Sequence, residues 1–374
     1  MSTSINIAAI ERELNSLWKQ AGSDDDHSSI IRACLLNLLV YIPDPASANK
    51  IDEIVVEISR ERPARAILMI ADRDSSESSL AAHVTSQCTV PDGMSKQVCC
   101  EEVTITASGA QVNEMPSAVV PLLMPDLPVY LWWQGVPQLS DKVFTYLGEI
   151  SDRVIIDSSK FADPHGDTVK LATLIRDNPK WTAFTDLNWA RLTAWRALFA
   201  GFYDVAQYRP ILDETNSLVI EYAPSDQNPQ AIPARVMLLA GWMTSRLRWT
   251  LTENPVKREG ASTIFNFSAD GRKITIHFVS TANTEIRHGL IASATIGCTK
   301  DNHADFKVSR SADGKRIETA VQIAERSHIQ RVLGYESWDE AALIGREIEI
   351  LGHDRVYEQA IVAAGQMITA LDNQ

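Results

Sequence analysis

The sequence has no long apolar run, few cysteines and an amino-terminal segment unlike a secretory signal. No stretch approaches the ~18–20 consecutive apolar residues that a membrane-spanning helix needs. Residues 1–20 lack a basic segment followed by an apolar core, which a secretory signal requires. Five cysteines are too few and too scattered for the disulfide framework of a secreted domain. We therefore expect a soluble, cytoplasmic protein.

The sequence also has fewer basic than acidic residues. The chain has 35 lysines and arginines against 48 aspartates and glutamates, a formal net charge of −13. A field of that sign repels phosphate backbones and anionic lipid, so we expect neither nucleic acid nor a membrane as partner. The 45% of hydrophobic residues is ordinary globular usage, which allows sizeable cores without disulfides or metals.

The motifs of common enzyme classes are missing. The sequence contains no G-x-G-x-x-G or G-x-x-x-x-G-K-[ST] nucleotide fingerprint and no G-x-S-x-G nucleophile elbow. It has neither C-x-x-C nor H-E-x-x-H, the spacings typical of metal ligands. We therefore predict no cofactor, no metal and no catalytic residues. An enzyme stays open as an alternative, because catalytic groups can assemble from distant positions. His165 and His277 are interpreted as a linker residue and a sheet residue.

The length of 374 residues predicts two domains. We expect amino-terminal helices over residues 1–45, at 5–20 and 28–41. An α/β domain should cover 46–166 and an α+β domain 167–374, with the polar stretch 157–167 as the candidate hinge.

In the first domain, short β-branched apolar runs alternate with helical patterns. Runs of this kind predict strands buried on both faces and a partly parallel sheet. The strands are expected at 66–71, 83–90, 98–106, 128–133 and 154–157, and the helices at 47–60, 110–123 and 139–149. The short turn between 83–90 and 98–106 indicates a hairpin, so the sheet should be mixed.

The second domain begins with helices and then changes to a period of two. Asp270-Gly271 and Asp313-Gly314 are turn signals within an antiparallel meander. Helices are expected at 168–177, 186–203, 232–248, 337–349 and 354–371, with a strand at 217–223.

Nine tryptophans are a high count, and several lie near arginines. On a helix over 186–203, Trp189 and Trp195 point about 120° apart, because they are six residues apart. Arg191 and Arg196 accompany them, and aromatic residues with arginine are typical of protein-binding hot spots. Either this helix is central to the fold, or it lies under an interface.

Two further arginine pairs stand out. Arg246 and Arg248 end the helix at 232–248, where cations favour the helix dipole and where they can also form a basic patch. Arg62 and Arg65 precede the strand at 66–71, where they can bind a phosphate or a carboxylate of a partner. The alternative for both pairs is solvated surface arginine. Asp354 is interpreted as a helix cap, with a partner-facing corner as the alternative.

Five segments together resemble one family, the glucose-6-phosphate dehydrogenase assembly proteins (OpcA) of cyanobacteria and actinobacteria. DLNWARLT followed by W-R is the most specific block. The segments are ERPARAILM (61–69), LPVYLWWQG (127–135), TDLNWARLTAWRALFAGFYD (185–204), AGWMTSRLRW (240–249) and LGHDRVYEQA (351–360).

The resemblance implies a protein that binds glucose-6-phosphate dehydrogenase and promotes its active oligomer. It also implies thioredoxin-linked redox control, although residues 354–374 contain no cysteine. In a hairpin of 80–90 with 96–106, Cys88 falls opposite Cys99 or Cys100, where a strained and easily reduced disulfide can form. The alternative is three reduced cysteines in an ordinary sheet.

The sequence thus predicts a non-enzymatic assembly factor and allosteric activator. The predicted partner-binding residues are Trp189, Arg191, Trp195, Arg196, Arg246 and Arg248. The alternatives are a sugar-phosphate-binding protein or enzyme with an arginine clamp, and a passive scaffold.

Overall fold

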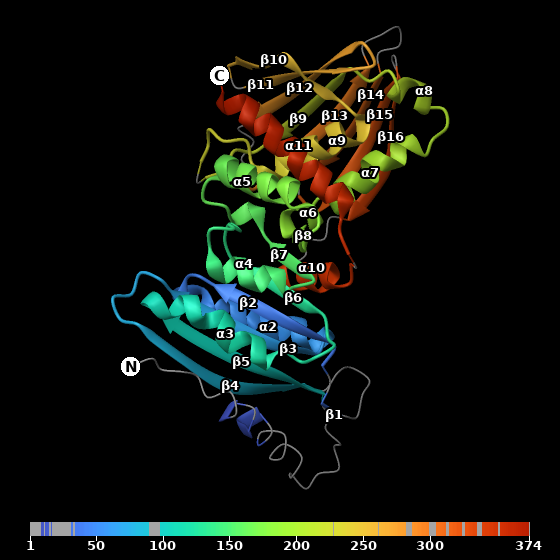
Figure 1. Ribbon diagram of the computed structural model, residues 1–374. Helices are drawn as coiled ribbons and strands as arrows, with labels where there is room; N and C mark the ends of the chain where they lie inside the picture. The colour runs from blue at the N-terminus through green and yellow to red at the C-terminus, as the bar shows by residue number, and fades with distance from the viewer. Residues whose placement is uncertain are drawn as a thin grey trace. The chain divides into compact units, whose positions relative to one another are not determined.

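A computed structural model gives the fold in two compact units (Figure 1). Unit 1 comprises Met1–Asp157, Lys180–Leu187 and Asp339–His353, and unit 2 comprises Ser158–Pro179, Asn188–Trp338 and Asp354–Gln374. The division after Asp157 falls inside the predicted hinge, whereas the return of two later segments to unit 1 is not apparent in the sequence. The structure describes residues 9–10, 12–14, 16, 31–32, 34–89, 98–226, 228–260, 262–281, 286–298, 304–311, 314–323, 326–334, 339–350 and 352–373.

Unit 1 is built on a mixed sheet, as predicted. Its parallel strands lie in the order β5-β3-β2-β6-β7-β8, and β4 pairs antiparallel with β5. The two-residue β1 pairs parallel with the start of β5. The strands are β1 Ile31–Arg32, β2 Leu36–Ile42, β3 Ala64–Asp72, β4 Ser79–Thr89, β5 Val98–Ser108, β6 Val129–Trp133, β7 Arg153–Ile156 and β8 Ala183–Asp186.

The order of these parallel strands has a consequence for the site. Six parallel strands remain when β1 is set aside. Numbered 1 to 6 along the chain, they lie side by side in the order 3-2-1-4-5-6, which is the arrangement of doubly wound dinucleotide-binding folds. The topological switch point lies between β2 and β6, where successive connections leave in opposite directions. Ligands of such sheets bind at the carboxyl ends of the strands at this point.

Strand β2 corrects the prediction of a helix over 28–41. All seven of its residues, Leu36–Ile42, are buried. A short apolar run buried on both faces has no alternation, so its sequence does not separate a central strand from a buried helix. In the other predicted helix, residues 9–10, 12–14 and 16 are helical, and the rest of 5–20 lies outside the described residues.

The helices of unit 1 follow the predicted pattern, with short 3-10 turns between them. Asp141 caps α4 by accepting hydrogen bonds from the backbone N–H groups of Val143 and Phe144. The bounds are η1 Pro45–Ser47, α2 Ala48–Glu61, η2 Gly109–Glu114, α3 Met115–Val119, η3 Val120–Leu122, α4 Lys142–Glu149 and α10 Glu340–Ile348.

Unit 2 is built on a largely antiparallel sheet of order β10-β11-β12-β9-β13-β14-β15-β16. The predicted turn between β11 and β12 is confirmed, since Asp270 and Gly271 both have positive φ. Strand β9 runs parallel to β12, so the predicted meander is interrupted at this strand. The strands are β9 Ser217–Tyr222, β10 Thr250–Glu259, β11 Ser262–Ala269, β12 Arg272–Ser280, β13 Ile291–Cys298, β14 Ala304–Arg310, β15 Arg316–Ile323 and β16 Arg326–Gly334.

The helices of unit 2 differ from the prediction over 186–203, and the short α8 was not predicted. The helix predicted at 337–349 of the second domain is α10, which belongs to unit 1. The expected long helix over 186–203 is instead the end of β8, the short α6 and then α7, because the helical bonding breaks around Arg191 and Leu192. The bounds are η4 Ser158–Lys160, α5 Pro164–Asp177, α6 Leu187–Ala190, α7 Thr193–Tyr203, α8 Arg209–Leu212, α9 Ala234–Leu247 and α11 Arg355–Asp372.

Helix α9 forms the centre of unit 2, with nearly every side chain from Ala234 to Thr244 buried. It packs closely on α11, and a Cβ on Gly241 would lie 2.2 Å from the carbonyl oxygen of Ala360. Only glycine permits this approach of the two backbones. Helix α5 packs on the same α11 at Gly365, whose added Cβ would meet Ala172 at 2.6 Å.

None of the described helices is both long enough and apolar enough to cross a membrane. In the described part of the chain, no group of three or more histidines, cysteines and acidic residues could hold a metal ion.

Candidate functional site

The carboxyl end of α9 presents two of the predicted partner-binding residues. Arg246 and Arg248 are both exposed, and among the described residues neither guanidinium has a hydrogen bond or an ion pair. The helix ends in a Schellman arrangement, in which the Trp249 N–H donates to the Thr244 carbonyl at 2.9 Å. The position after the last helical residue, usually glycine, is Arg248, with φ 56° and ψ 39°.

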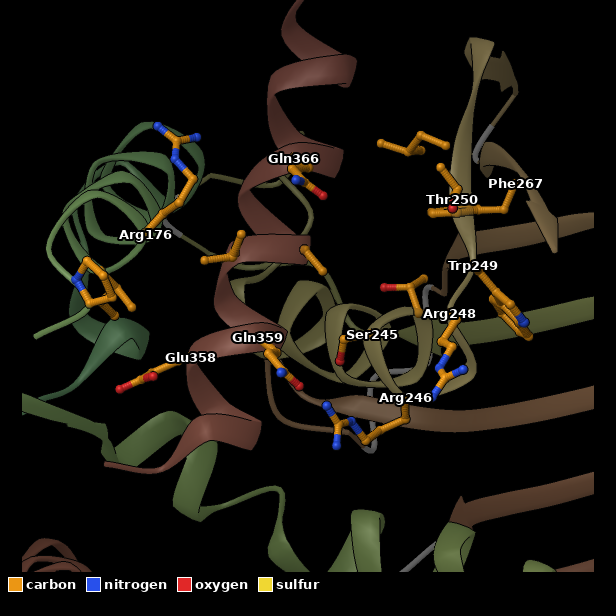
Figure 2. A pocket seen from close by; sticks show the side chains of 16 residues that line it. Arg176, Ser245, Arg246, Arg248, Trp249, Thr250, Phe267, Glu358, Gln359 and Gln366 are labelled. Carbon is orange, nitrogen blue, oxygen red and sulfur yellow. The ribbon is translucent and has the colours of Figure 1, made fainter. Parts of the chain in front are cut away.

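A groove of about 880 Å³ in unit 2 brings these arginines together with α11, α5 and the start of β10. Figure 2 shows Arg246 and Arg248 on one side of α11 and Arg176 on the other. Trp249 and Phe267 form an aromatic wall and are only 7% and 3% exposed. We call this cavity the arginine groove. Its lining residues are Ile175, Arg176, Pro179, Thr244, Ser245, Arg246, Arg248, Trp249, Thr250, Leu251, Phe267, Glu358, Gln359, Val362, Ala363 and Gln366.

The other tryptophan–arginine group holds the start of α11. The Trp189 indole N–H donates to Asp354 Oδ2 at 2.9 Å, and the Trp189 ring lies 5.8 Å from that of Tyr357. Arg196 stacks over the Trp189 ring, with its guanidinium carbon 3.5 Å from the ring centroid. Asp354 also caps α11, accepting from the Val356 and Tyr357 N–H groups. The cap interpretation of Asp354 is therefore confirmed.

The predicted residues of 186–203 differ in accessibility. Trp189 is 2% and Trp195 1% exposed, which favours the interpretation of a buried segment over an exposed interface for both indoles. Arg191 and Arg196 are half-buried, and Arg191 donates to Ser159 Oγ at 3.3 Å. Trp189 and Arg196 support the start of α11, whereas Arg246 and Arg248 face the groove.

The second arginine pair of the sequence analysis is engaged inside unit 1. Arg65 is 2% exposed, forms an ion pair with Glu101 and donates to the Leu122 carbonyl at 2.7 Å. Arg62 binds Glu349 and the Gly345 carbonyl. A phosphate clamp at Arg62 and Arg65 is therefore wrong, because both guanidiniums hold partners within the fold.

The two singled-out histidines have structural contacts. His165 lies in the first turn of α5 rather than in a linker, and its Nε2 is 3.1 Å from the Ile232 nitrogen. Burial lowers the pKa of His165 below its ordinary value. His277 is a half-buried sheet residue near Thr275.

The predicted cysteine register is present in the backbone. Strands β4 and β5 pair antiparallel with Cys88 directly opposite Cys99. The side chains of Cys88, Cys99 and Cys100 and the turn at 90–97 lie outside the described residues. The redox interpretation therefore stays a prediction.

Packed aromatic side chains lie at the switch point of the unit 1 sheet. Tyr41 at the end of β2 stacks on Trp133 at the end of β6, with ring centroids 3.8 Å apart and planes 6° apart. Both side chains are buried, at 2% and 3% exposure. Arg73 donates to the Tyr41 oxygen at 3.1 Å and binds both carboxylate oxygens of Asp141 at 2.9 and 3.0 Å. Burial raises the pKa of Tyr41 above its ordinary value.

The loop after β2 also lacks the features that bind a pyrophosphate. Dinucleotide-binding folds place a glycine-rich turn there, whose free N–H groups receive the phosphates. This chain has Pro43-Asp44-Pro45, where the two prolines carry no N–H and the Asp44 carboxylate already accepts from the Ala46 N–H. The strand order is that of a dinucleotide-binding fold, but this crevice does not fit the ligand. We call it the filled crevice.

Solved structures share only a distant likeness with the chain. The transcriptional regulator Gal80p from Kluyveromyces lactis has a TM-score of 0.46 and 10% identity, covering 95% of this chain and 94% of that one. The WlbA dehydrogenase from Thermus thermophilus has a TM-score of 0.42 and 9% identity, covering 89% and 95%. Scores below 0.5 transfer no function or site.

Curated relatives are closer. The putative OxPP cycle protein OpcA of Nostoc punctiforme is 26% identical over 325 residues, 82% of this chain and 66% of that protein. The protein of the same name from Synechocystis is 24% identical, covering 86% and 66%. That from Synechococcus elongatus is 32% identical over 51% of this chain and 41% of its own length. The chain thus spans just under two thirds of the first two relatives.

Two family models cover most of the chain. The model of the glucose-6-phosphate dehydrogenase subunit N-terminal domain matches residues 55–173, and that of the C-terminal domain matches residues 182–361. The matched ranges contain all five segments on which the sequence resemblance rested. The chain belongs to the OpcA family of glucose-6-phosphate dehydrogenase assembly proteins.

Proposed function

We propose that this protein binds glucose-6-phosphate dehydrogenase and promotes its active oligomer without catalysing a reaction itself. The match of both family models over 55–173 and 182–361 carries this proposal, since both are described as glucose-6-phosphate dehydrogenase subunit domains. The filled crevice supports the non-catalytic part. Tyr41 and Trp133 pack together at the carboxyl ends of the two strands that flank the switch point, where a doubly wound sheet binds its cofactor, and Tyr41 accepts from Arg73.

Activation requires that the chain bind the active oligomer more tightly than the other states of the enzyme. A differential of about 1–3 kcal/mol gives an effect of several-fold to a hundredfold. In this proposal Arg246 and Arg248 contact the enzyme directly. Trp189 acts by holding the start of α11 in place, with Arg196 stacked on its ring. Trp195 and Arg191 act within the surrounding fold. The relevant partner is a protein, in the cytoplasm.

Reconstitution with the purified dehydrogenase tests the proposal. We expect the two proteins to co-elute in size-exclusion chromatography, in a larger assembly and with a higher kcat/KM than the enzyme alone. Co-elution with unchanged kinetics would indicate a passive scaffold instead. Separate elution over a range of concentrations would contradict the proposal.

A sugar-phosphate-binding role is a second candidate, because Arg246 and Arg248 are exposed and line a groove with hydroxyl and amide groups. Titration calorimetry of the isolated chain with glucose 6-phosphate separates the two. Micromolar binding that is lost in Arg246→Ala would favour this second role. If the titration releases no binding heat, the result favours the assembly role.

Redox control through Cys88 and Cys99 is a further part of the proposal, with thioredoxin as the candidate reductant. The support is the direct pairing of these positions between β4 and β5. Peptide mapping by mass spectrometry after oxidation should recover a Cys88–Cys99 cross-link that thioredoxin removes. Oxidised chain without a link from Cys88 to Cys99 or Cys100 would end the idea. Cys298, a buried free cysteine outside this hairpin, serves as the internal control.

A further inference from the structure

The arginine groove continues along α11 into a second hollow. This adjoining cavity of about 290 Å³ shares Arg176, Val362 and Gln366 with the first and extends to Asn373. From Glu358 to Asn373 the helix rises about 22 Å, at ~1.5 Å per residue. The combined depression therefore follows four turns of α11. Arg176, Arg246, Thr250 and Gln366 on its borders are exposed, so it is open to solvent.

Beyond Glu358, the accessible face of α11 in this groove carries no charge. Residues 359–371 contain no Asp, Glu, Lys or Arg, in a chain in which 22% of residues are charged. This face is nevertheless accessible, since Gln366 and Thr369 are exposed and Val362 and Ala363 are half-buried. A solvated helix face normally carries charges. Depletion of charge is the compositional sign of an interface centre.

The charges lie on the border of this neutral strip and are mainly positive. Arg246 and Arg248 have no ionic partner among the described residues, whereas Arg176 pairs with the neighbouring Asp177. Glu358, which pairs with Arg355, is the acidic residue of the lining. In a protein of net charge −13, a border of unneutralised arginines is matched by carboxylates on its occupant.

The backbone at Arg248 is a second, independent sign. A left-handed conformation disfavours every residue with a Cβ relative to glycine, and arginine has no side-chain group that compensates locally, as asparagine has. Strained backbone positions concentrate at binding sites. The chain thus keeps an arginine at a position where glycine would be more stable, and that arginine lines the groove.

We propose that the arginine groove is the docking site for an amphipathic segment of the partner enzyme. The segment places small apolar side chains against Val362, Ala363 and Gln366 and carboxylates against Arg246 and Arg248. The length of ~22 Å fits about four helical turns or seven extended residues, and it exceeds what a sugar phosphate can span. This inference rests on the proposed function and adds the surface and the chemistry of the contact.

Binding of the full chain to the dehydrogenase, measured by interferometry at about 0.05 and 0.3 M salt, tests the docking site. Arg246→Glu/Arg248→Glu should raise Kd about tenfold or more at the lower salt, because carboxylates would face carboxylates. Gln366→Glu should raise Kd several-fold, and Gln366→Lys should raise it less. A difference in this direction would indicate that the occupant is negatively charged. All four substitutions lie on exposed side chains.

Lys273→Glu is the matched control, since Lys273 is an exposed cation of unit 2 outside the groove. It should change Kd by less than about twofold. Circular dichroism melts should show that all variants stay folded.

Four other outcomes overturn the proposal. If the double variant binds like the wild type, the groove is the wrong surface and the proposed function stands. If the wild type does not bind the dehydrogenase at all, both fail together. If sedimentation shows a dimer that the double variant dissolves, the occupant is a second copy of this chain. If glucose 6-phosphate binds the isolated chain and displaces the enzyme, the groove is a sugar-phosphate site.

Discussion

The filled crevice of unit 1 and the arginine groove of unit 2 differ in whether their arginines have partners within the chain. In the crevice, Arg73 is satisfied by Tyr41 and Asp141, and the aromatic pair beneath it is buried. In the groove, Arg246 and Arg248 are left to solvent, and the neutral face of α11 is accessible. Groups that are satisfied within the chain contribute to stability, whereas unsatisfied exposed groups are available to a partner.

The comparison therefore predicts different consequences of mutation. Changes in the crevice should lower the free energy of unfolding, and changes in the groove should alter binding with little cost in stability. The following predictions are ordered from the largest expected effect to the smallest.

Trp133→Ala should lower the free energy of unfolding by about 3–5 kcal/mol, because it removes a buried indole that packs on Tyr41 and Phe144. Urea denaturation followed by circular dichroism measures the change. Val362→Ala in the groove is the matched truncation and should cost less than about 1 kcal/mol, since that side chain is half-buried. If both variants lost the same free energy of unfolding, the crevice and the groove would not differ in their contribution to stability.

Buried charge in unit 1 should also make stability depend on pH. Glu102 is 6% exposed, and burial together with the nearby Asp52 raises its pKa from 4.5 to about 7. The folded chain then holds a proton that the unfolded chain releases, so this stability is present below pH ~4.5 and is lost as pH rises through ~7.

Glu102→Gln should flatten that part of the pH profile and raise stability above pH 7 by up to about 3 kcal/mol. Denaturation midpoints from pH 5 to about 8 provide the measurement. Glu318→Gln, on a strand of unit 2, is the matched control substitution. An unchanged profile in Glu102→Gln would exclude Glu102 as its source.

The walls of the groove depend on the close contact of α9 with α11. Gly241→Ala should destabilise the chain by about 1–3 kcal/mol, because the added Cβ would collide with the Ala360 carbonyl. Gly345→Ala on α10 of unit 1 is the matched helix substitution, with no atom within 4 Å of the added Cβ. It should stabilise by about 0.5–1 kcal/mol. Relative to the wild type, the melting temperature should fall in Gly241→Ala and rise in Gly345→Ala.

The smallest predicted effect on stability concerns Arg248, where stability and binding should respond differently to the same substitution. Arg248→Gly should leave stability unchanged or raise it by up to about 1 kcal/mol, because glycine adopts positive φ without the Cβ penalty. The same change should weaken binding to the dehydrogenase. Arg248→Ala removes the guanidinium but keeps the strain, so it should weaken binding without the gain. Loss of stability in Arg248→Gly would show that the arginine serves the fold.

Much of the architecture was predictable from local pattern. The strand at Val129–Trp133 and the turn at Asp270-Gly271 have strong local signals, and both were predicted. The strand Leu36–Ile42 was predicted as a helix, because a fully buried run has no period. The return of residues 180–187 and 339–353 to unit 1 depends on contacts between residues distant in sequence, which no local pattern predicts.

The site was predictable only in part. Arg246 and Arg248 were identified from their position at a helix end, and the structure places both at the groove. The burial of Trp189 and Trp195 was not decided, since helical spacing does not show which face is covered. The contribution of α11 was missed, although its signal was present: residues 359–371 lack charge throughout.

Trp249 gives the arginine groove an optical reporter of its own. Its indole lies in the aromatic wall beside Phe267, with ring centroids 6.5 Å apart, and is 7% exposed. Indole emission shifts with the polarity of its surroundings, so an occupant that displaces water from this wall changes the colour and intensity of the emitted light. A Trp249→Phe variant removes that contribution and identifies the part of any signal that comes from the groove. Occupancy can thus be followed in unlabelled protein, in real time.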